Sequence, residues 1–510
     1  MTTFAPDTAP PEVDDATALR ERARVAIELL EAIDADRGLL AALTDEERER
    51  LLRATRVVSD PDPRARRRLV KATRRQRKAA MAAQDESVLT STGIRELRRK
   101  PVFTTPNYFL AALKQVPSAK SESTSESRHC YVCKEHFQTV HHFYDQMCPA
   151  CAEFNFAKRT ELADLTGRVA LLTGGRVKIG YQAGLKLLRG GAHLIVTTRF
   201  PRDSAARYAA EPDFAEWSHR LEIFGLDLRH TPSVEAFCAE LVATRGRLDF
   251  IINNACQTVR RPPAFYEHMM EGETTALHAM SAAERKLLGD FEGVRSANLL
   301  SDGNRAAMSA SLSASLSQVP LLPEDHVADA ALFPQGRLDQ DLQQVDLRGR
   351  NSWRLLLDEV SSVELLEVQL VNAVAPFIIN ARLKPLLLRT VNRDKHIVNV
   401  SAMEGQFYRT SKTTRHPHTN MAKAALNMMT RTSAADYAAD GIHMNSVDTG
   451  WVTDEDPAAI AARKTIEQRF HPPLDIIDGA ARIVDPIVSG LNTGEHVWGQ
   501  FLKDYKPTEW

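Results

Sequence analysis

Short aliphatic runs that alternate with stretches of helical periodicity dominate the chain from Leu165 onward. Six such runs stand at residues 169–173, 193–197, 221–225, 250–253, 396–400 and 442–447. Because parallel strands must be joined by crossover helices, this alternation predicts an α/β fold with a doubly wound parallel sheet. The rhythm is broken between Thr258 and Asp346, so we expect an insertion at about 258–346.

A chain of 510 residues exceeds one ordinary hydrophobic core, which predicts two or three domains. Composition shifts divide it into a helical N-terminal region at 1–115, a polar linker at 116–128, a small cysteine module at 129–160 and the α/β domain at 161–510. The formal net charge of −1 argues against polyanion binding by the molecule as a whole. No apolar stretch approaches the length of a bilayer span, so we expect a cytoplasmic protein without a membrane partner.

A glycine-rich segment follows the first predicted strand and leads into a helix. A turn of this kind lets the backbone approach a pyrophosphate, which then lies at the positive N-terminus of the helix. The segment therefore predicts a dinucleotide site, and its candidate binding residues are Thr173, Gly174, Gly175, Arg176, Lys178, Ile179 and Gly180.

Two further motifs follow at regular distances, Asp227-Leu228 after the third strand and Asn253-Asn254-Ala255 after the fourth. Together with the turn they resemble the short-chain dehydrogenase/reductase family, whose motifs are a TGxxxGxG turn, an acidic residue near the adenine, and NNAG. The resemblance covers the chain from about Leu165 to the C-terminus. It implies a Rossmann domain that binds a dinucleotide and a small-molecule substrate, with Asp227, Leu228, Asn254 and Ala255 at the cofactor. Lys178 and Cys256 replace two of the family's glycines.

The end of the second strand sets the choice of cofactor in such domains, because an acidic residue there binds the ribose 2′-OH and an arginine accommodates a 2′-phosphate. This chain has Arg199 at that place, with Arg176 in the turn and Arg202 just beyond, so three guanidinium groups could converge where the extra phosphate would lie. We therefore expect NADP(H) in preference to NAD(H), which remains possible. The alternative is that these arginines are simply solvated in surface loops.

The resemblance also implies a reaction centre of Ser, Tyr, Lys and Asn, in which the Tyr phenol exchanges a proton with the substrate oxygen. Lys423 matches the Lys, which also binds the cofactor ribose, and Asn372 matches the Asn. The Tyr position, four residues before the Lys, holds Thr419, and the Ser position, three residues before a Gly, holds Ala402. The expected catalytic Ser and Tyr are therefore missing.

Tyr408 offers a second possible phenol, because Tyr408 and Lys412 repeat the Y-x-x-x-K spacing. This pair precedes the matching helix by too many residues, so we keep Tyr408 only as a weak catalytic candidate. Ser401 stands one residue before the family's Ser position, and in a strand such an offset turns the side chain to the opposite face. His418 is no better supported as a proton donor.

Four cysteines form two C-x-x-C pairs, at Cys130 and Cys133 and at Cys148 and Cys151. Their spacing is that of a zinc ribbon or treble-clef site, in which four thiolates enclose a structural Zn²⁺ and leave no open position for catalysis. The remaining two cysteines, Cys238 and Cys256, stand in apolar surroundings and are expected to be bystanders.

Residues 64–78 form a predicted helix in which nine of fifteen residues are Lys or Arg and none is acidic. This helix could bind a nucleic acid or a phosphate-rich protein partner. It could equally be a solvated face that pairs with the acidic residues Asp45, Glu46, Glu47 and Glu49, which the lack of a stacking aromatic slightly favours.

The short-chain dehydrogenase/reductase family usually pairs the helices that here carry Asn372 and Lys423. The resemblance therefore implies a homo-oligomer, with an interface of apolar residues on these helices: Val371, Val374, Leu426, Met428 and Met429.

Two hypotheses follow for function. The first is an NADP(H)-dependent oxidoreductase with a non-standard proton relay. The second is a catalytically inactive dinucleotide-binding scaffold or sensor that engages a partner through its zinc module and N-terminal helices. The sequence identifies no substrate.

Overall fold

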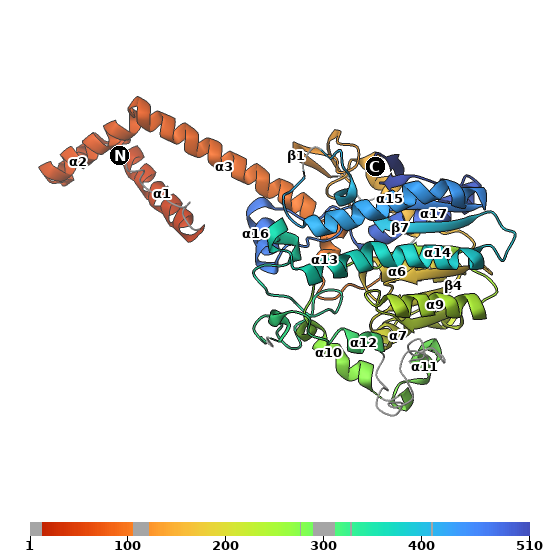
Figure 1. The fold of residues 1–510 in the computed structure, drawn as a ribbon. Helices are drawn as coiled ribbons and strands as arrows, with labels where there is room; N and C mark the ends of the chain where they lie inside the picture. Colours follow the sequence, from red (N-terminus) through yellow and green to blue (C-terminus); the bar gives the residue numbers. More distant parts are fainter. Residues whose placement is uncertain (1–12, 106–121, 276, 289–311, 327–328, 410–411) are drawn as a thin grey trace. The chain divides into compact units, whose positions relative to one another are not determined.

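The computed structural model describes residues 13–105, 122–275, 277–288, 312–326, 329–409 and 412–510 (Figure 1). It divides into two compact units, Met1–Gln84 and Asp85–Trp510.

The first unit is helical. It contains α1 (Val13–Ala35), a 3₁₀ turn at Arg37–Ala42, α2 (Asp45–Ser59) and most of α3 (Pro63–Thr90). Thr44 caps α2, because its hydroxyl accepts a hydrogen bond from the Glu47 N–H and the Glu47 carboxylate accepts one from the Thr44 N–H. Among residues 17–84 no side chain is buried, so this unit has no hydrophobic core of its own.

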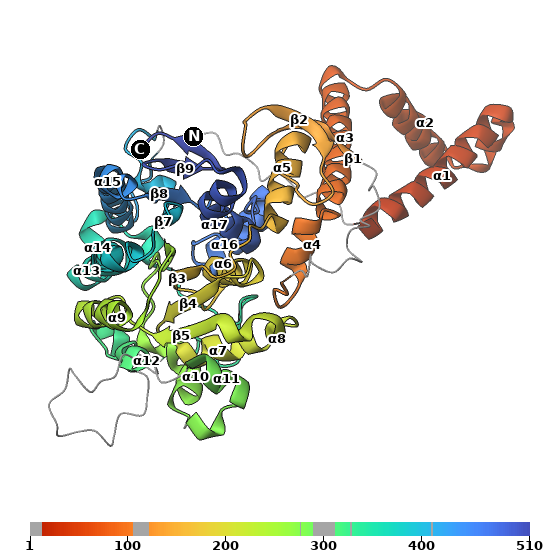
Figure 2. The same cartoon turned by 90° about the vertical axis from the view of Figure 1, so that its right-hand side faces the viewer.

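The second unit is built on an eight-stranded sheet whose order is β10-β9-β8-β7-β6-β3-β4-β5 (Figure 2). All neighbours are parallel except the terminal hairpin of β9 and β10. The strands are β3 (Val169–Thr173), β4 (His193–Thr198), β5 (Leu221–Gly225), β6 (Phe250–Asn253), β7 (Lys395–Ser401), β8 (Ile442–Asp448), β9 (Phe501–Lys503) and β10 (Lys506–Thr508). This order confirms the predicted doubly wound α/β fold.

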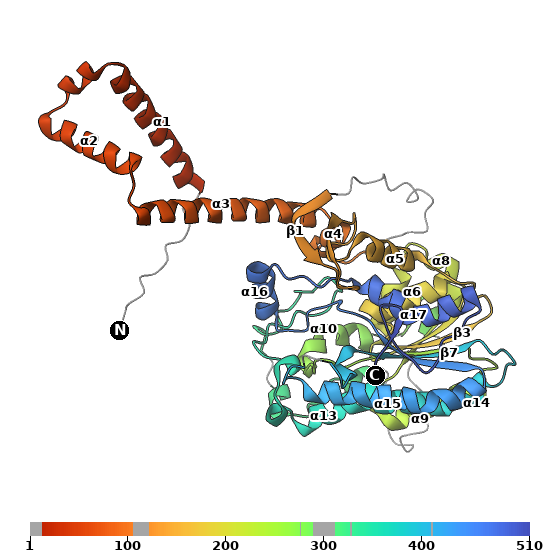
Figure 3. The ribbon, with the colours of Figure 1, turned by 90° about the horizontal axis from the view of Figure 1, so that it is seen from above.

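Helices cover both faces of the sheet (Figure 3). One face packs against α6 (Lys178–Arg189) and α17 (Ile476–Thr493), and the other against α9 (Thr231–Thr244), α14 (Ala375–Leu387) and α15 (Pro417–Ala439). Each face buries its own hydrophobic cluster. The six predicted strands are all present. The sequence missed β9 and β10, because three residues are too short for a periodic pattern.

Smaller helices fill the remaining connections. They are α7 (Pro201–Ala209), α8 (Phe214–Trp217), α10 (Pro263–Thr274), α11 (Ala282–Leu288), α12 (Leu312–Leu316), α13 (Ser362–Gln369) and α16 (Ala458–Gln468). The predicted insertion contributes α10, α11 and α12, and an aromatic cluster of Phe265, Tyr266 and Phe333 packs it against Phe200 before α7.

The cysteine module consists of β1 (Glu122–His129), β2 (His136–Val140) and α5 (Pro149–Thr160). The strand β1 corrects part of the predicted linker at 116–128. Its exposed polar residues hide any apolar period, but it pairs with β2, and the Asp85 carboxylate accepts hydrogen bonds from the Ser125 and Glu126 N–H groups. The rest of that linker, 116–121, lies outside the described residues.

The first unit ends at Gln84, and α4 (Gly93–Arg99), which lies inside the predicted N-terminal region, belongs to the second unit. The last part of that predicted region, 106–115, lies outside the described residues. Ile94 is buried in the core of the cysteine module, and the Arg95 guanidinium pairs with the buried Asp145 carboxylate at 2.5 Å.

A buried ion network joins the cysteine module to the sheet domain. Arg159 of α5 donates to Asp475 and Asp478 at the start of α17, each at 2.8 Å, and the Tyr144 hydroxyl also donates to Asp478. Arg482 donates to Asn155 of α5 at 2.7 Å. Because removal of one partner would leave another charge buried and unpaired, this network fixes the module on the domain.

One helical stretch, Ser362–Leu387, is long and apolar enough to cross a membrane by length and composition. Its buried residues Ile379, Leu383, Leu386 and Leu387 belong to the core of the sheet, which accounts for its hydropathy.

Candidate functional site

The glycine-rich turn has the tight geometry that its sequence predicts. Gly174 has a φ of 70° and Lys178 a φ of 55°, so the lysine adopts the left-handed conformation that usually requires glycine. A Cβ added at Gly180 would lie 2.2 Å from the Gly174 carbonyl oxygen and 2.4 Å from Asn254 Nδ2. The helix α6 therefore starts in direct contact with the turn.

The motif after β6 holds this turn from the other side. Asn254 Nδ2 donates to the carbonyl oxygens of Thr173 and Gly174, both at 3.1 Å, and the Ala255 N–H donates to the Thr173 hydroxyl at 3.1 Å. These two sequence motifs thus form one structural unit at the carboxyl ends of the strands.

A cavity of about 720 Å³ opens beside the glycine-rich turn and the Asn254-Ala255 motif. Ten of the predicted cofactor residues line it: Gly174, Arg176, Lys178, Ile179, Gly180, Arg199, Asp227, Leu228, Asn254 and Ala255. The other three, Thr173, Gly175 and Lys423, do not. Thr173 and Gly175 lie buried beneath the turn, where a Cβ on Gly175 would meet Val196 at 2.8 Å.

The three predicted arginines differ in their surroundings. Arg199 lines the cavity, donates to the Tyr266 hydroxyl at 2.7 Å, and places its guanidinium carbon 4.6 Å from the centre of that ring. Arg176 also lines it but pairs with Asp203 at 2.7 Å, and burial lowers the pKa of its guanidinium. Arg202 is buried and is not among the cavity residues.

Asp227, which the sequence predicts at the adenine, forms an ion pair with Arg229 of the same loop. Arg229 donates to its carboxylate at 2.7 Å. Burial acts to raise the pKa of Asp227, but the hydrogen bonds and charge of Arg229 outweigh it and lower the pKa. The carboxylate is therefore ionised, and its position is fixed at the cavity wall.

The insertion supplies cavity residues that the sequence did not predict. Tyr266 orients Arg199, and the Gln343 side-chain oxygen accepts a hydrogen bond from Arg176 at 3.2 Å. The Asp341 carboxyl lies near Lys178 and Arg207, and burial raises its pKa. Because these residues belong to no motif and stand far from the turn in sequence, nothing in the sequence connected them with the nucleotide site.

Asn372 lies in a π-helical turn at Leu370–Val374, between α13 and α14. Its side-chain oxygen accepts from the Gln257 N–H at 2.8 Å, and its Nδ2 donates to the Gln257 carbonyl oxygen at 3.1 Å. The side chain thus fixes the loop that follows Asn254, Ala255 and Cys256. Turns of this type are frequent at functional sites.

Lys423 lies on α15, is buried, and donates to the Val400 carbonyl oxygen at 2.8 Å. Gly405 packs so closely on it that an added Cβ would lie 2.7 Å from the Lys423 carbonyl carbon. Thr419 is also buried, one turn earlier on the same helix, and its hydroxyl has no hydrogen-bond partner among the described residues. Neither residue lines the cavity.

Ser401 is a second buried hydroxyl in this region without a hydrogen-bond partner among the described residues. Asn399, two residues earlier on β7, donates to the Thr430 hydroxyl of α15 at 3.0 Å. Because alternate residues of a strand share a face, Ser401 faces α15, the helix that carries Lys423. Ala402 follows the strand in an extended conformation.

The two alternative proton donors lie in contrasting places. Tyr408 is 86% exposed, whereas His418 is buried, with its Nε2 3.4 Å from a Glu364 carboxylate oxygen. The neighbouring His416 stacks on Trp353 with the ring centres 3.8 Å apart, and burial lowers its pKa to about 4. This stacked pair covers the start of α15.

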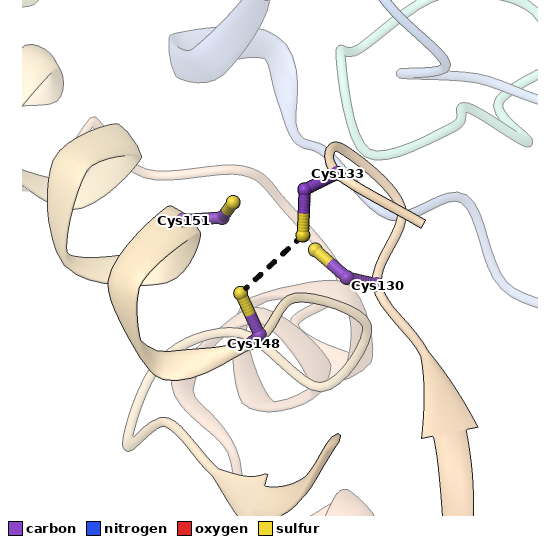
Figure 4. Close-up of side chains that lie close together, drawn as sticks. All are labelled: Cys130, Cys133, Cys148 and Cys151. Carbon is purple, nitrogen blue, oxygen red and sulfur yellow. Dashed lines mark hydrogen bonds between the residues drawn. The ribbon is translucent and has the colours of Figure 1, made fainter. Parts of the chain in front are cut away.

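The four predicted metal ligands converge (Figure 4). Their Sγ atoms all lie within 4.8 Å of one another, and those of Cys133 and Cys148 are 3.7 Å apart. In a tetrahedron with zinc–sulfur distances of about 2.3 Å, neighbouring sulfurs are about 3.8 Å apart. Burial acts to raise the pKa of Cys130, but backbone N–H groups of Cys148, Cys133 and Val132 outweigh it and lower the pKa to about 7.

Comparison with known proteins bears on this site. The family model described as short chain dehydrogenase matches residues 168–281, and the one described as Enoyl-(Acyl carrier protein) reductase matches residues 354–473. An uncharacterized protein of Acanthamoeba polyphaga mimivirus is 31% identical over 371 residues, which are 71% of this chain and 71% of that protein. The chain belongs to the short-chain dehydrogenase/reductase family.

Other relatives match over shorter stretches. The WW domain-containing oxidoreductase of Danio rerio is 31% identical over 194 residues, which are 38% of this chain and 42% of that protein. The dehydrogenase/reductase SDR family member 13 of Bos taurus is 35% identical over 108 residues, which are 20% and 28% of the two chains. The chain thus spans less than half the length of these two relatives. The NADP complex of RhlG from Pseudomonas aeruginosa has 16% identity and a TM-score of 0.40, covering 66% of this chain and 95% of that one.

Within the short-chain dehydrogenase/reductase family this chain departs from the usual pattern at two kinds of position. Lys178 replaces a glycine of the turn and keeps its left-handed backbone. Thr419 stands at the position predicted for the tyrosine, and its hydroxyl lacks the acidity of a phenol. The phenol that α15 does carry, Tyr437, is buried and donates to the Asn380 carbonyl oxygen at 3.0 Å.

Proposed function

We propose that this protein binds NADP(H) and acts as an oxidoreductase on a small carbonyl or alcohol substrate, without a tyrosine as the proton donor. The observation that carries the proposal is the cavity at the glycine-rich turn, where Gly174, Gly180 and Asn254 shape a close approach for a pyrophosphate.

The side chains around the cavity favour the phosphorylated dinucleotide. Arg199 lies at the end of β4, where a 2′-phosphate would be bound, and Lys178 adds a cation at the turn. Arg176 contributes less, since Asp203 already balances its charge. NADPH supplies a hydride when bound, and the residues of this chain position it.

The proton must then come from a group other than tyrosine. Ser401 and Thr419 present buried hydroxyls near the end of β7 and the start of α15, and Lys423 supplies a cation between the two elements. In this proposal a water bound by these groups donates the proton, and Lys423 holds it in place. Such a relay is a poorer general acid than a positioned phenol.

Calorimetry with NADPH and NADH tests the binding half of the proposal, and a screen of ketones and aldehydes with NADPH tests the catalytic half. We expect NADPH to bind more tightly than NADH and the substitution Arg199→Asp to reverse the order. If neither dinucleotide binds at millimolar concentration, the proposal is wrong. An unchanged preference in Arg199→Asp would contradict only the role of the 2′-phosphate.

A second candidate function is a dinucleotide-binding scaffold without turnover. It is favoured by one observation, that Lys423 and Thr419 are buried and do not line the cavity. Tight NADPH binding without turnover of any substrate, together with weak activity in a Thr419→Tyr, Ala402→Ser double variant, would support this second function.

We further propose that Cys130, Cys133, Cys148 and Cys151 hold a structural Zn²⁺, since four convergent thiols close the tetrahedron and leave no position for substrate. The site requires reduced thiols, as in the cytoplasm, where we expect the protein to act.

We also propose a homo-oligomer that pairs the α13–α14 stretch and α15 with a second copy. Of the apolar residues named from the sequence, Val374 and Met428 are exposed, at 38% and 55%, but Leu426 is buried. Phe377, at 59%, joins this surface. Light scattering should show at least a dimer at micromolar concentration, and Phe377→Glu should give a monomer. A monomeric wild-type protein would contradict the proposal.

A further inference from the structure

One wall of the cavity is a long connection between β8 and α17. This stretch, residues 451–474, contains α16, and we call it the wall segment. Its residues 452–458 line the cavity, and so do Ala461 and Pro472. No residue from 458 to 472 is buried, so the wall segment has little packing of its own to fix its shape.

The cysteine module holds the first end of the wall segment through Tyr131, which stands between Cys130 and Cys133. The Tyr131 hydroxyl accepts a hydrogen bond from the Trp451 N–H at 3.0 Å. The approach is so close that a Cβ added to Gly450 would lie 3.2 Å from the same hydroxyl oxygen. Because the partner is a backbone group, this bond fixes the path of the chain as it leaves β8.

The second end of the wall segment is held in the same way. The Gln146 side-chain amide, just before the second cysteine pair, donates to the His471 carbonyl oxygen at 2.7 Å. Arg98 of α4 donates to the carbonyl oxygens of Pro472 and Leu474, at 3.0 and 2.6 Å. Four hydrogen bonds therefore join α4 and the cysteine module to backbone groups at the two ends of the wall segment.

The cysteines decide where two of these partners lie. Tyr131 belongs to the loop of the first pair, and its N–H donates to the carbonyl oxygen of Gln146, beside the second pair, at 2.8 Å. A Zn²⁺ held by both pairs would join these two loops, since each pair supplies two of its four ligands. Small metal modules loosen when the metal is removed. The metal would therefore act on the wall segment through Tyr131 and Gln146.

Other contacts hold the middle of the wall segment but not its ends. Asn351 Nδ2 donates to the Glu455 carbonyl oxygen at 2.9 Å, and Arg354 donates to the Asp456 carboxylate at 2.6 Å. Loss of the bonds at the ends would thus leave residues 455–456 attached and let the chain on either side of them move.

We propose that the cysteine module is a clamp on the cavity. In this clamp Tyr131 is a positioning residue for the wall segment, and metal occupancy sets how firmly the segment closes on a bound dinucleotide. Val452, next to the bonded Trp451, links the clamp to the nucleotide turn, because it shares a buried cluster with Ile179. The inference rests on the proposed NADP(H) and zinc sites, but its first test observes the wall segment directly and needs no cofactor.

The first test measures hydrogen–deuterium exchange of the full chain by mass spectrometry. Tyr131→Phe removes the acceptor of the Trp451 N–H. The matched control is Tyr505→Phe in the terminal hairpin, since the Tyr505 hydroxyl is buried and has no hydrogen-bond partner among the described residues. We expect peptides of the wall segment to exchange about threefold to tenfold faster in Tyr131→Phe, as loss of one hydrogen bond implies, and the control to stay within about 1.5-fold of wild type.

The second test removes the metal with a chelator and restores it with ZnCl₂, with elemental analysis before and after. Exchange of the wall segment should rise at least about tenfold without metal and return when zinc is added, and peptides of β6 should change far less. Gln146→Met, which removes the donor at the other end of the segment, should act in the same direction as Tyr131→Phe.

NADPH binding separates positioning from mere stability. Calorimetry should show a loss of about threefold or more in affinity for Tyr131→Phe, whereas its melting temperature stays within about 3 °C of the control. A wild-type protein that binds no NADPH would overturn the proposed function, and exchange of the wall segment would still decide the clamp.

Three results would overturn the clamp. The first is equal exchange of the wall segment in Tyr131→Phe and in the control. The second is a rise in exchange that spreads evenly over the sheet. The third is exchange of the wall segment that is the same before and after chelation.

Discussion

Two sets of residues at the carboxyl ends of the strands depart from the short-chain dehydrogenase/reductase motifs in different ways. The nucleotide edge consists of residues 173–180 with Asn254 and Ala255, and the predicted catalytic edge consists of Ala402, Thr419 and Lys423. At the nucleotide edge, Lys178 takes over the backbone conformation of a glycine, with a φ of 55°, and the turn keeps its contacts with Asn254 and Ala255. At the catalytic edge, we predict that Thr419 on α15 and Ala402, which directly follows β7, stand where the family has its Tyr and Ser, and neither carries the group that the chemistry needs.

This difference follows from what each edge must do. A phosphate site is made largely of backbone N–H groups and a helix N-terminus, so a side chain can change while the site survives. Proton transfer depends on the pKa of a particular side chain, and a threonine hydroxyl cannot replace a phenol. We therefore expect cofactor binding and turnover to separate in this protein.

The largest effect should come from the cysteine module. Its buried cluster includes Ile179 at the nucleotide turn and Val452 after β8. The double variant Cys148→Ser, Cys151→Ser should lose its zinc and lower the melting temperature by more than 10 °C, because the metal would no longer join the loop of Cys130 and Cys133 to the start of α5. Elemental analysis and calorimetric melting measure both.

The matched control is Cys256→Ser, since Cys256 is exposed and outside the cluster. It should keep about one zinc per chain. If the wild-type protein contains no zinc and its four module thiols alkylate freely, the proposed zinc site is wrong.

The next largest effect concerns the nucleotide edge alone. Gly180→Ala should weaken NADPH binding at least a hundredfold, because the new Cβ would overlap the Gly174 carbonyl oxygen and Asn254 Nδ2. Gly246→Ala is the control, since a Cβ there meets nothing within 4 Å. Calorimetric titration compares the two. Equal affinities would show that the dinucleotide binds elsewhere.

The sequence predicted those parts of the molecule that depend on local pattern. The six longer strands, the turn and the four converging thiols all follow from period and spacing, and the structure contains them. The sequence did not predict β1, because an exposed polar strand such as Glu122–His129 resembles a linker in composition.

The contents of the cavity were less predictable, because they depend on contacts between distant segments. Tyr266 and Gln343 reach Arg199 and Arg176 from the insertion, across separations of 67 and 167 residues. Asp227 was expected at the adenine, but its closest partner is Arg229, only two residues away, whose role the family motif does not describe. Side-chain pairing of this kind becomes visible only when the fold is known.

A smaller effect is expected at the catalytic edge. Thr419→Tyr with Ala402→Ser should raise NADPH-dependent reduction of simple ketones about tenfold, because Lys423 lies one turn from the new phenol and can lower its pKa. A positioned general acid contributes about two to four orders of magnitude in rate, and an unrefined site should recover only part of that.

Two controls test whether the gain in rate depends on Lys423 and not on tighter binding of NADPH. Lys423→Ala in the double variant should abolish the gain, and NADPH affinity should change less than the rate does. If the wild-type protein already turns over rapidly and Tyr408→Phe abolishes the activity, the exposed loop supplies the phenol and the catalytic edge is intact after all.

The smallest effect is expected at Tyr266, where the insertion meets the nucleotide edge. Its hydroxyl and ring hold Arg199 at the cavity wall, so Tyr266→Ala should free the arginine and weaken NADPH binding about tenfold while NADH binding changes little. Tyr266→Phe keeps the ring under Arg199 and removes only the hydrogen bond, which affects the cofactor only through the position of the arginine, so we expect a loss of threefold or less. Calorimetry with both dinucleotides and both variants separates the outcomes. If Tyr266→Ala weakens NADPH and NADH equally, Tyr266 supports the cavity as a whole, and the preference for a 2′-phosphate must come from Lys178 or Arg176.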